Sequence, residues 1–359
     1  MPTVSVVIAS YNHEKYVAET IQSVIDQTYQ DFEIVITDDG SADGTVAEIR
    51  RFADPRIRLT CFESNCGACA AMDNCLDQAK GEYIAVLNSD DAFLPGKLDK
   101  QVRFLNDHPE IGAVFGLAQF MDEEGRRLTD TSHQYSAVFA TANRSRHEWL
   151  NHFFFEGNCL CHPSVLLRRK CYETVGCYDR RLAQLPDLDF WVRLCMKYDI
   201  HIMDEELVKF RICRSNASAG TPEHLTRHWW EFRHVLDHYL GLENVDDLRR
   251  IFPDAKGLLT DRDADLIPFA VAMIALQKTG PTSFAHKSFA LDTVFDLLAD
   301  PERAQRVSTK CAFRYVDFLK LTGQIDAYNI LRGPGSQRKP KMNPLKSAIR
   351  KLTGLGRNR

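Results

Sequence analysis

The sequence predicts an α/β fold with a doubly wound, mostly parallel sheet and a C-terminal helical region. Over about the first 120 residues, short β-branched segments alternate with amphipathic helical segments, a pattern typical of a parallel sheet covered by helices. After residues 221–222, strand-like segments become few while helical periodicity continues. The chain of 359 residues also exceeds the usual size of one compact core, so two units are expected.

Strands are expected first, at the β-branched segments. They are residues 4–9, 32–37, 57–61, 83–87 and 111–120. Between the first two, Val17, Ile21, Val24 and Ile25 recur at helical spacing, so one helix face should pack on the sheet. Asn12 is the expected cap of this helix.

Further helices are expected at residues 68–79, after Pro95 and at residues 187–198. The fixed φ of Pro95 suits a first helical turn. In the last helix, an apolar stripe sets the register, and Asp189 and Arg193 stand four residues apart, so they can form an ion pair.

Composition indicates a folded protein without a global basic field. Apolar residues make up 44% and charged residues 26%, which is ordinary for globular proteins. A net charge of −4 gives no general attraction for nucleic acid, so no nucleic-acid partner is expected. We expect three regions: a sheet domain at 1–220, a helical domain at 221–330 and a basic tail at 331–359.

The basic tail is predicted to touch an anionic membrane surface. Residues 327–359 contain nine Lys or Arg and no Asp or Glu, and Leu345, Ile349 and Leu352 follow helical spacing among the cations. The alternative is a solvated, disordered tail, which its Gly and Pro residues favour. Because no apolar segment is long enough to cross a bilayer, a cytoplasmic protein with at most peripheral contact at the inner face of the membrane is expected.

Acidic side chains follow two strands of the predicted sheet. Ligands of open parallel sheets bind outside the carboxyl ends of the strands, where residues 38–41 (DDGS) and 88–91 (NSDD) lie. Taken alone, Asp-Gly-Ser equally describes a tight turn followed by a helix cap. Two acidic strand ends together indicate a cation site for a diphosphate, because Mg²⁺-like ions are held by one or two carboxylates plus phosphate oxygens. Asp90 and Asp91 are the candidate anchor.

Five motifs occur in order over about residues 3–220. They are residues 4–12 (VSVVIASYN), 34–41 (IVITDDGS), 81–91 (GEYIAVLNSDD), 162–169 together with 175–179 (HPSVLLRR and VGCYD), and 186–194 (PDLDFWVRL). Together they resemble the family 2 inverting glycosyltransferases of GT-A fold. The resemblance implies transfer of a sugar from a nucleotide diphosphate donor, a UDP-sugar, to an acceptor hydroxyl. The implied acceptor is a glycan or lipid-linked molecule, in surface polysaccharide or glycan synthesis.

Site residues follow from the resemblance position by position. It implies that Asp38 hydrogen-bonds the nucleotide base and that Ala9 and Tyr11 wall the nucleoside. It further implies that one of Asp90 and Asp91 meets the ribose or the metal, while the other holds the metal, Mn²⁺ or Mg²⁺, at the diphosphate.

The catalytic base implied by the resemblance is Asp187. Asp189 is the competing carboxylate, but its place on the same helix points it elsewhere and toward Arg193. Asp187 would take the acceptor proton while the sugar passes through an oxocarbenium-like state and the anomeric configuration inverts.

Departures from the family pattern keep alternatives open. Asn88 replaces a carboxylate; an Asp there should tighten metal binding if that side chain faces the ion. Cys213 stands where a His is common, and either ligates as a thiolate or packs as a small apolar residue. Arg211 and Arg214 are available for the diphosphate. A non-catalytic nucleotide-sugar binding or scaffold protein that retains the fold is the alternative function.

Overall fold

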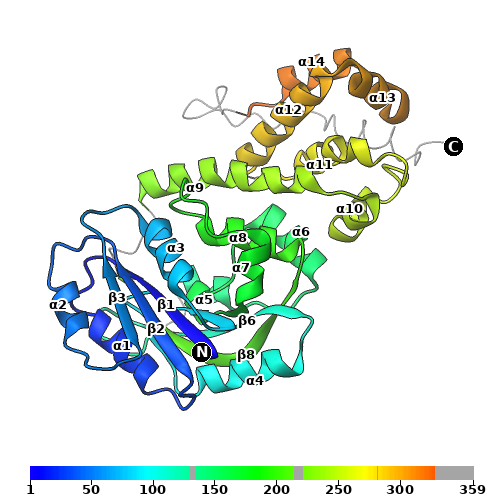
Figure 1. Ribbon diagram of the computed structural model, residues 1–359. Coiled ribbons are helices and arrows are strands. Elements are labelled where there is room, and N and C mark those ends of the chain that lie inside the picture. The colour runs from blue at the N-terminus through cyan, green and yellow to red at the C-terminus, as the bar shows by residue number, and fades with distance from the viewer. Residues whose placement is uncertain (130–133, 214–220, 281, 328–359) are drawn as a thin grey trace. The chain divides into compact units, whose positions relative to one another are not determined.

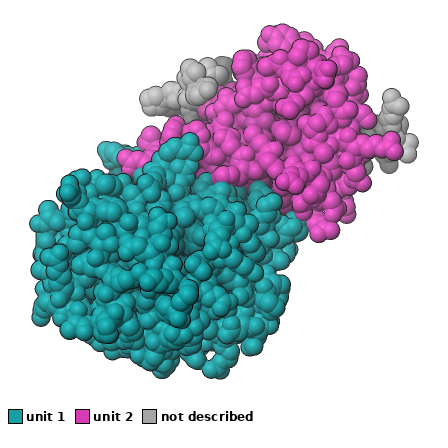
Figure 2. All heavy atoms as spheres, in the orientation of Figure 1, with its two compact units in different colours: residues 1–149, 158–224 teal, residues 150–157, 225–359 magenta. Residues whose placement is uncertain are grey.

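The computed structural model describes residues 1–129, 134–213, 221–280 and 282–327. The chain divides into two compact units (Figure 2). Unit 1 contains residues 1–149 and 158–224, and unit 2 contains residues 150–157 and the chain from residue 225 onward. The change of pattern near residue 221 indicated a second unit, but nothing in the sequence indicated that residues 150–157 belong to it.

Unit 1 is built on one mixed sheet of eight strands, counted over the described part of the chain (Figure 1). The strands are β1 (Val4–Ser10), β2 (Phe32–Asp38), β3 (Ile57–Cys61), β4 (Tyr83–Val86), β5 (Ala92–Phe93), β6 (Ile111–Met121), β7 (Leu166–Arg168) and β8 (Asp199–Arg211). Their order is β3-β2-β1-β4-β7-β6-β8-β5. The first four are parallel, so β1, β2 and β4 end at the same edge.

The other half of the sheet mixes directions. β7 runs antiparallel to both β4 and β6, β6 and β8 are parallel, and β5 pairs antiparallel with β8. Because Ala92 of β5 pairs with Lys209 of β8, the carboxyl end of β8 lies beside the segment between β4 and β5.

Helices of unit 1 cover the sheet (Figure 1). They are α1 (Val17–Ile25), α2 (Thr45–Arg50), α3 (Ala68–Gln78), α4 (Lys97–Asp107), α5 (Gln134–Phe139), α7 (Arg169–Val175) and α8 (Pro186–Cys195), with α6 (Arg146–Glu156) divided between the units. Val17, Ile21 and Val24 of α1 lie fully buried in one cluster with Val6 and Ile8 of β1. Each such side chain stabilises the fold by roughly 1.5–3 kcal/mol.

The predicted cap of one helix is wrong, and the helix expected after Pro95 is present but begins two residues further on. α1 begins at Val17 after Tyr16, and Asn12 is not its cap: Asn12 has φ 51° and its side-chain oxygen accepts a hydrogen bond from the Ala42 amide. α4 begins after Gly96, which has φ 80°, so Pro95 lies outside the first turn. In both places a left-handed residue turns the chain before the helix starts.

The regular elements of unit 2 are helices, joined by turns, within its described residues. Beyond α9 (Pro222–Val235), most of which belongs to it, its helices are α10 (Val245–Ile251), α11 (Ile267–Ala275), α12 (Phe284–Ala299), α13 (Pro301–Cys311) and α14 (Tyr315–Gln324). None of the helices described in the chain is long and apolar enough to span a membrane.

The core of unit 2 is completed by residues 150–157. The ring of Phe154 lies 4.8 Å from Tyr239 and 4.8 Å from Phe252, centroid to centroid. His286 Nε2 lies 2.6 Å from the Phe154 carbonyl oxygen, and the Tyr239 hydroxyl donates to the Leu150 carbonyl. A short segment from the middle of the chain is thus held by helices that follow it by about a hundred residues.

Candidate functional site

Asp38 ends β2 at the edge where the parallel strands terminate. Its side-chain oxygens accept hydrogen bonds from the Ser10 hydroxyl (2.9 Å), the Ser41 hydroxyl (2.6 Å) and the Ser41 amide (2.8 Å). The buried carboxylate therefore joins the end of β1 to the turn after β2. The nucleotide-base contact expected of Asp38 would have to share oxygens already used in this way.

Asp39, which we did not single out from the sequence, holds a second loop at the same edge. Its carboxylate accepts hydrogen bonds from the backbone amides of Cys66 (2.7 Å) and Gly67 (2.9 Å), directly before α3. Beside it, Gly40 has φ 72° and lies so close to Ser64 that a Cβ would meet the Ser64 carbonyl carbon at 2.6 Å. In the sequence, the pair Asp38-Asp39 before Gly40 was the signal that could have pointed to this role of Asp39.

The expected nucleoside wall lies at the end of β1. Ala9 is partly buried among buried neighbours, and the Tyr11 ring that follows is 43% exposed. An exposed aromatic ring beside the strand end offers a flat surface on which a base can stack.

The Asp91 carboxylate is held by hydrogen bonds from two other residues of the chain. One carboxylate oxygen accepts from the Arg211 amide at 2.7 Å and the other from the Asn88 side-chain nitrogen at 2.8 Å. Burial and the charge of Asp90 raise the pKa of Asp91 well above its usual range. Asn88 therefore presents its amide nitrogen to Asp91, so only its amide oxygen could meet a cation.

Asp90 is the less constrained carboxylate. It is 8% exposed, and no other described residue donates a hydrogen bond to its side chain in this structure. Burial raises its pKa, while the charges of His13 and Arg211 act in the opposite direction. A nearly buried carboxylate with unused oxygens fits a divalent cation shared with a diphosphate.

No group of three or more His, Cys, Asp or Glu side chains that could hold a metal ion occurs within the described residues. Two adjacent carboxylates fit an ion only when the diphosphate supplies most of the remaining oxygens. At Asp90 and Asp91, a bound cation would therefore need oxygens from the substrate.

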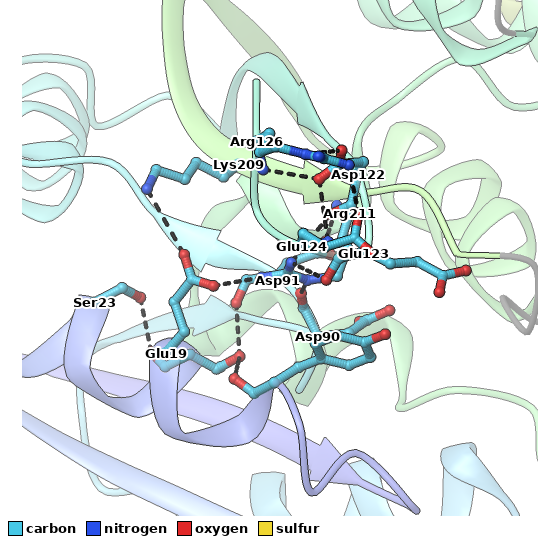
Figure 3. Close-up of polar contacts among 12 residues, drawn as sticks. Glu19, Ser23, Asp90, Asp91, Asp122, Glu123, Glu124, Arg126, Lys209 and Arg211 are labelled. Carbon is cyan, nitrogen blue, oxygen red and sulfur yellow. Dashed lines mark hydrogen bonds and ion pairs between the residues drawn. The ribbon is translucent and has the colours of Figure 1, made fainter. Parts of the chain in front are cut away.

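Arg211 is an internal anchor (Figure 3). Its guanidinium donates to the Asp90 carbonyl at 2.8 Å, to the Asp122 and Glu123 carbonyls at 3.1 Å each, and to the Glu19 carboxylate at 2.5 Å. The side chain is buried. These bonds connect the segment after β4, the turn after β6, and α1.

Protein acceptors already take several donors of Arg211, so the predicted phosphate contact, which stays a prediction, would have to share them. Its guanidinium also lies 4.7 Å from the centre of the Tyr16 ring. Arg214, expected to act with it, lies outside the described residues.

Cys213 lies buried next to this anchor and hydrogen-bonds with Tyr16. Burial raises the pKa of the Cys213 thiol, and the charges of Asp90 and Glu123 raise it further. Burial likewise raises the pKa of Tyr16 to about 12, with Cys213 contributing. A protonated, packed thiol is favoured over a thiolate ligand.

Asp187 lies in the first turn of α8, directly after Pro186 at the helix start. One oxygen accepts from the Leu188 amide at 2.8 Å, and the other accepts from the Asn158 side-chain nitrogen at 2.6 Å. The residue is partly exposed. Both bonds orient the carboxylate through neutral donors, and the helix dipole favours its ionised form.

Asp189 has different surroundings, as the sequence predicted. It is buried and accepts from Arg193 at 2.9 Å (Nε) and 2.7 Å (Nη2), so the expected ion pair is confirmed. Arg193 also donates to the Cys177 carbonyl at 2.8 Å. This pair connects α8 to the turn after α7 and leaves Asp189 neutralised.

A hydrogen-bonded network links α7, the segment between α7 and α8, and the segment before β7. The Tyr178 hydroxyl lies 2.8 Å from His162 Nε2 and 3.0 Å from the Tyr172 hydroxyl. Burial raises the pKa of Tyr178, and the Asp187 charge contributes to the rise. Burial also lowers the pKa of His162 to about 4, so the ring is neutral at pH 7.

Known sequences resemble this chain over the region that carries the site. The model of the family described as Glycosyl transferase family 2 matches residues 5–170. An uncharacterized glycosyltransferase of Methanocaldococcus jannaschii is 32% identical over 216 residues, which are 59% of this chain and 71% of that protein. The putative teichuronic acid biosynthesis glycosyltransferase TuaG of Bacillus subtilis is 29% identical over 65% of this chain and 88% of its own length.

Solved structures resemble the fold. S. aureus TarS 1-349 in complex with UDP-GlcNAc matches with a TM-score of 0.54 and 18% identity, over 87% of this chain and 93% of that one. Mannosyltransferase PcManGT from Pyrobaculum calidifontis, in complex with GDP-Man and Mn²⁺, matches with a TM-score of 0.51 and 17% identity, over 90% and 86%. The fold is thus an α/β GT-A fold with a C-terminal helical region.

Proposed function

The chain belongs to glycosyltransferase family 2, and from this premise we propose that it moves a sugar from a nucleoside diphosphate to an acceptor hydroxyl with inversion at the anomeric carbon. The observation that carries the proposal is the contrast within α8. Asp187 is partly exposed and oriented by amide donors, whereas Asp189 is buried and paired with Arg193. A base must reach a substrate proton, and the partial exposure of Asp187 supports this role for it.

The donor that we propose is a UDP-sugar. TarS, whose fold this chain shares, was solved with UDP-GlcNAc. The exposed Tyr11 ring would stack on the base, Ala9 leaves room beside it, and Asp38 would bind the base edge. Asp39 would stabilise the turn that carries Asp38, because its carboxylate accepts hydrogen bonds from the two backbone amides before α3.

The metal that we propose is Mn²⁺ or Mg²⁺, held by Asp90, with Asp91 at its side. When bound, the ion would neutralise charge on the departing diphosphate. Asp91 keeps its position through the Arg211 amide, and Arg211 holds the Asp90 backbone through its carbonyl. The protein thereby positions both carboxylates before any donor arrives. PcManGT, of similar fold, was solved with Mn²⁺.

The acceptor that we propose is a growing glycan or a lipid-linked sugar of surface polysaccharide synthesis. The resemblance to TuaG supports this assignment. In the reaction, Asp187 takes the proton of the acceptor hydroxyl as that oxygen attacks the anomeric carbon and the bond to the diphosphate breaks.

The experiment is a donor panel. Purified protein is mixed with nucleotide sugars and Mn²⁺, thermal stabilisation identifies the donor, and release of nucleoside diphosphate with glycan acceptors reports turnover. We expect one donor to stabilise the protein and turnover to stop in excess chelator. Stabilisation without any release across the acceptors would favour a non-catalytic binding protein instead.

A further inference from the structure

An exposed apolar face lies on two contacting helices of unit 2. Phe295 of α12 is 66% exposed, and Tyr315, Val316 and Leu319 of α14 are 66%, 42% and 50% exposed. The Phe295 ring lies 6.4 Å from that of the buried Phe318, which connects the two helices. We call the four exposed side chains the apolar face. α14 already buries its other side, so the fold alone does not account for this surface.

The chain that follows α14 is strongly basic. α14 ends at Gln324, and residues 328–359, beyond the described part, contain nine Lys or Arg and no Asp or Glu. Only a few residues therefore separate the apolar face from a segment whose charge is entirely positive. Neither feature is needed to bind a nucleotide sugar, because every candidate site residue precedes residue 221.

We propose that the apolar face and the basic segment 328–359 together bind the surface of an anionic lipid bilayer. Such a surface offers negative headgroups and, just beneath them, an apolar boundary where Phe and Tyr side chains are favoured. A few inserted side chains or a basic segment alone give weak, reversible binding, whereas two linked signals give stable attachment. The inference stands independently of the transfer reaction.

Charge favours a bilayer over a second copy of this chain on the same face. Pairing two apolar faces would bring together two segments with nine cations each, and like charges repel. A bilayer containing phosphatidylglycerol supplies the opposite charge and the apolar contact in one surface.

The test measures co-sedimentation of the full chain with vesicles of phosphatidylcholine and phosphatidylglycerol, and with vesicles of phosphatidylcholine alone. We expect binding to the anionic vesicles only, weakened by salt. Phe295→Ser combined with Leu319→Ser should weaken it about tenfold, because two exposed apolar side chains can no longer enter the boundary. The matched control is Leu225→Ser on α9, since Leu225 is 52% exposed and Leu319 is 50% exposed; it should bind normally.

A second variant tests the basic segment within the full chain. Replacing Lys346, Arg350 and Lys351 with Gln should weaken binding and flatten its salt dependence. Circular dichroism should show unchanged folding in each variant, because all substituted positions are exposed or lie beyond the described residues.

Three results would overturn the proposal. They are equal sedimentation of the apolar-face variant and the parent chain, equal binding to neutral vesicles, and a dimer that the apolar-face variant dissociates while vesicle binding persists. Nucleoside diphosphate release with a soluble acceptor is measured separately. If release fails while vesicle binding responds as expected, only the proposed transfer function falls.

Discussion

Two carboxylates in one helical turn differ in what they can do. Replacing Asp187 with Asn keeps the size and most hydrogen bonds of the side chain but removes its basicity. We expect turnover to fall about 10²–10⁴-fold, because general-base assistance contributes that much. Donor and Mn²⁺ affinity, measured by titration calorimetry, should change little.

Asp189→Asn is the matched comparison. It leaves Arg193 partly buried without its charge partner, so it should lower the free energy of unfolding by about 1–3 kcal/mol and leave most of the turnover. Near-normal turnover in the Asp187 variant, together with an inactive but folded Asp189 variant, would assign the base to the other residue.

Asn88→Asp should weaken Mn²⁺ binding. A side chain that faced the ion would instead give tighter binding after this substitution. The Asn88 amide nitrogen donates to Asp91 at 2.8 Å, and a carboxylate there would put a like charge at contact distance. We expect the variant to unfold more easily by about 1–3 kcal/mol at pH 7 and to need more Mn²⁺ for turnover. Asn88→Ala, which removes the donor without adding a charge, is the control. Tighter Mn²⁺ binding in Asn88→Asp would contradict the observed orientation.

For single residues, the sequence predicted the contacts whose partners lie close together in the chain. The Asp189–Arg193 pair follows from helical spacing alone. Arg211 could not be placed in this way, because its partners lie on α1, beside β4 and after β6. Asp39 was missed because its two donors come from a loop about 27 residues further on. Which donor meets which acceptor across the sheet depends on the tertiary fold.

The loops at the strand ends depend on close backbone approach. Gly40→Ala should lower the free energy of unfolding by about 2–4 kcal/mol, because Ala there has a positive φ and its Cβ would meet the Ser64 backbone at 2.6 Å. Gly96→Ala, with φ 80° and only Lys100 within 4 Å, should cost about 1 kcal/mol. Chemical denaturation measures both, and equal losses would mean that the approach to Ser64 is relaxed.

Strands differed in how well the sequence predicted them. β1, β2, β3, β4 and β6 were expected, because each is a short segment rich in β-branched or other apolar residues. β7 has only three residues, and β5 has two. β8 is long, but its pairing with β6 contains register shifts and its middle residues are exposed, so neither alternation nor a continuous apolar run marks it.

The whole molecule should lose stability in mild acid through buried histidines. Burial lowers the pKa of His286 from near 6.5 to about 4. As pH falls from 6.5 toward 4, the unfolded chain takes up a proton that the folded chain does not, so the free energy of unfolding falls. Above pH 6.5 this contribution is fully present. His286→Gln keeps a donor for the Phe154 carbonyl but does not titrate.

Melting temperatures of both proteins between pH 4 and 7 measure this effect. Between pH 6.5 and pH 4, the free energy of unfolding of the parent chain should fall by roughly 2–4 kcal/mol more than that of the variant. Parallel pH profiles would mean that the His286 ring is protonated in the folded chain.

The division of α6 between the units bears on how the protein is made. Residues 150–157 emerge from the ribosome long before the helices that cover Phe154, since Phe252 and His286 follow by about a hundred residues. During that interval a strongly aromatic segment has no native partners. Synthesis therefore passes through a stage at which the sheet of unit 1 can form while the aromatic side chains of this segment are still without their later partners.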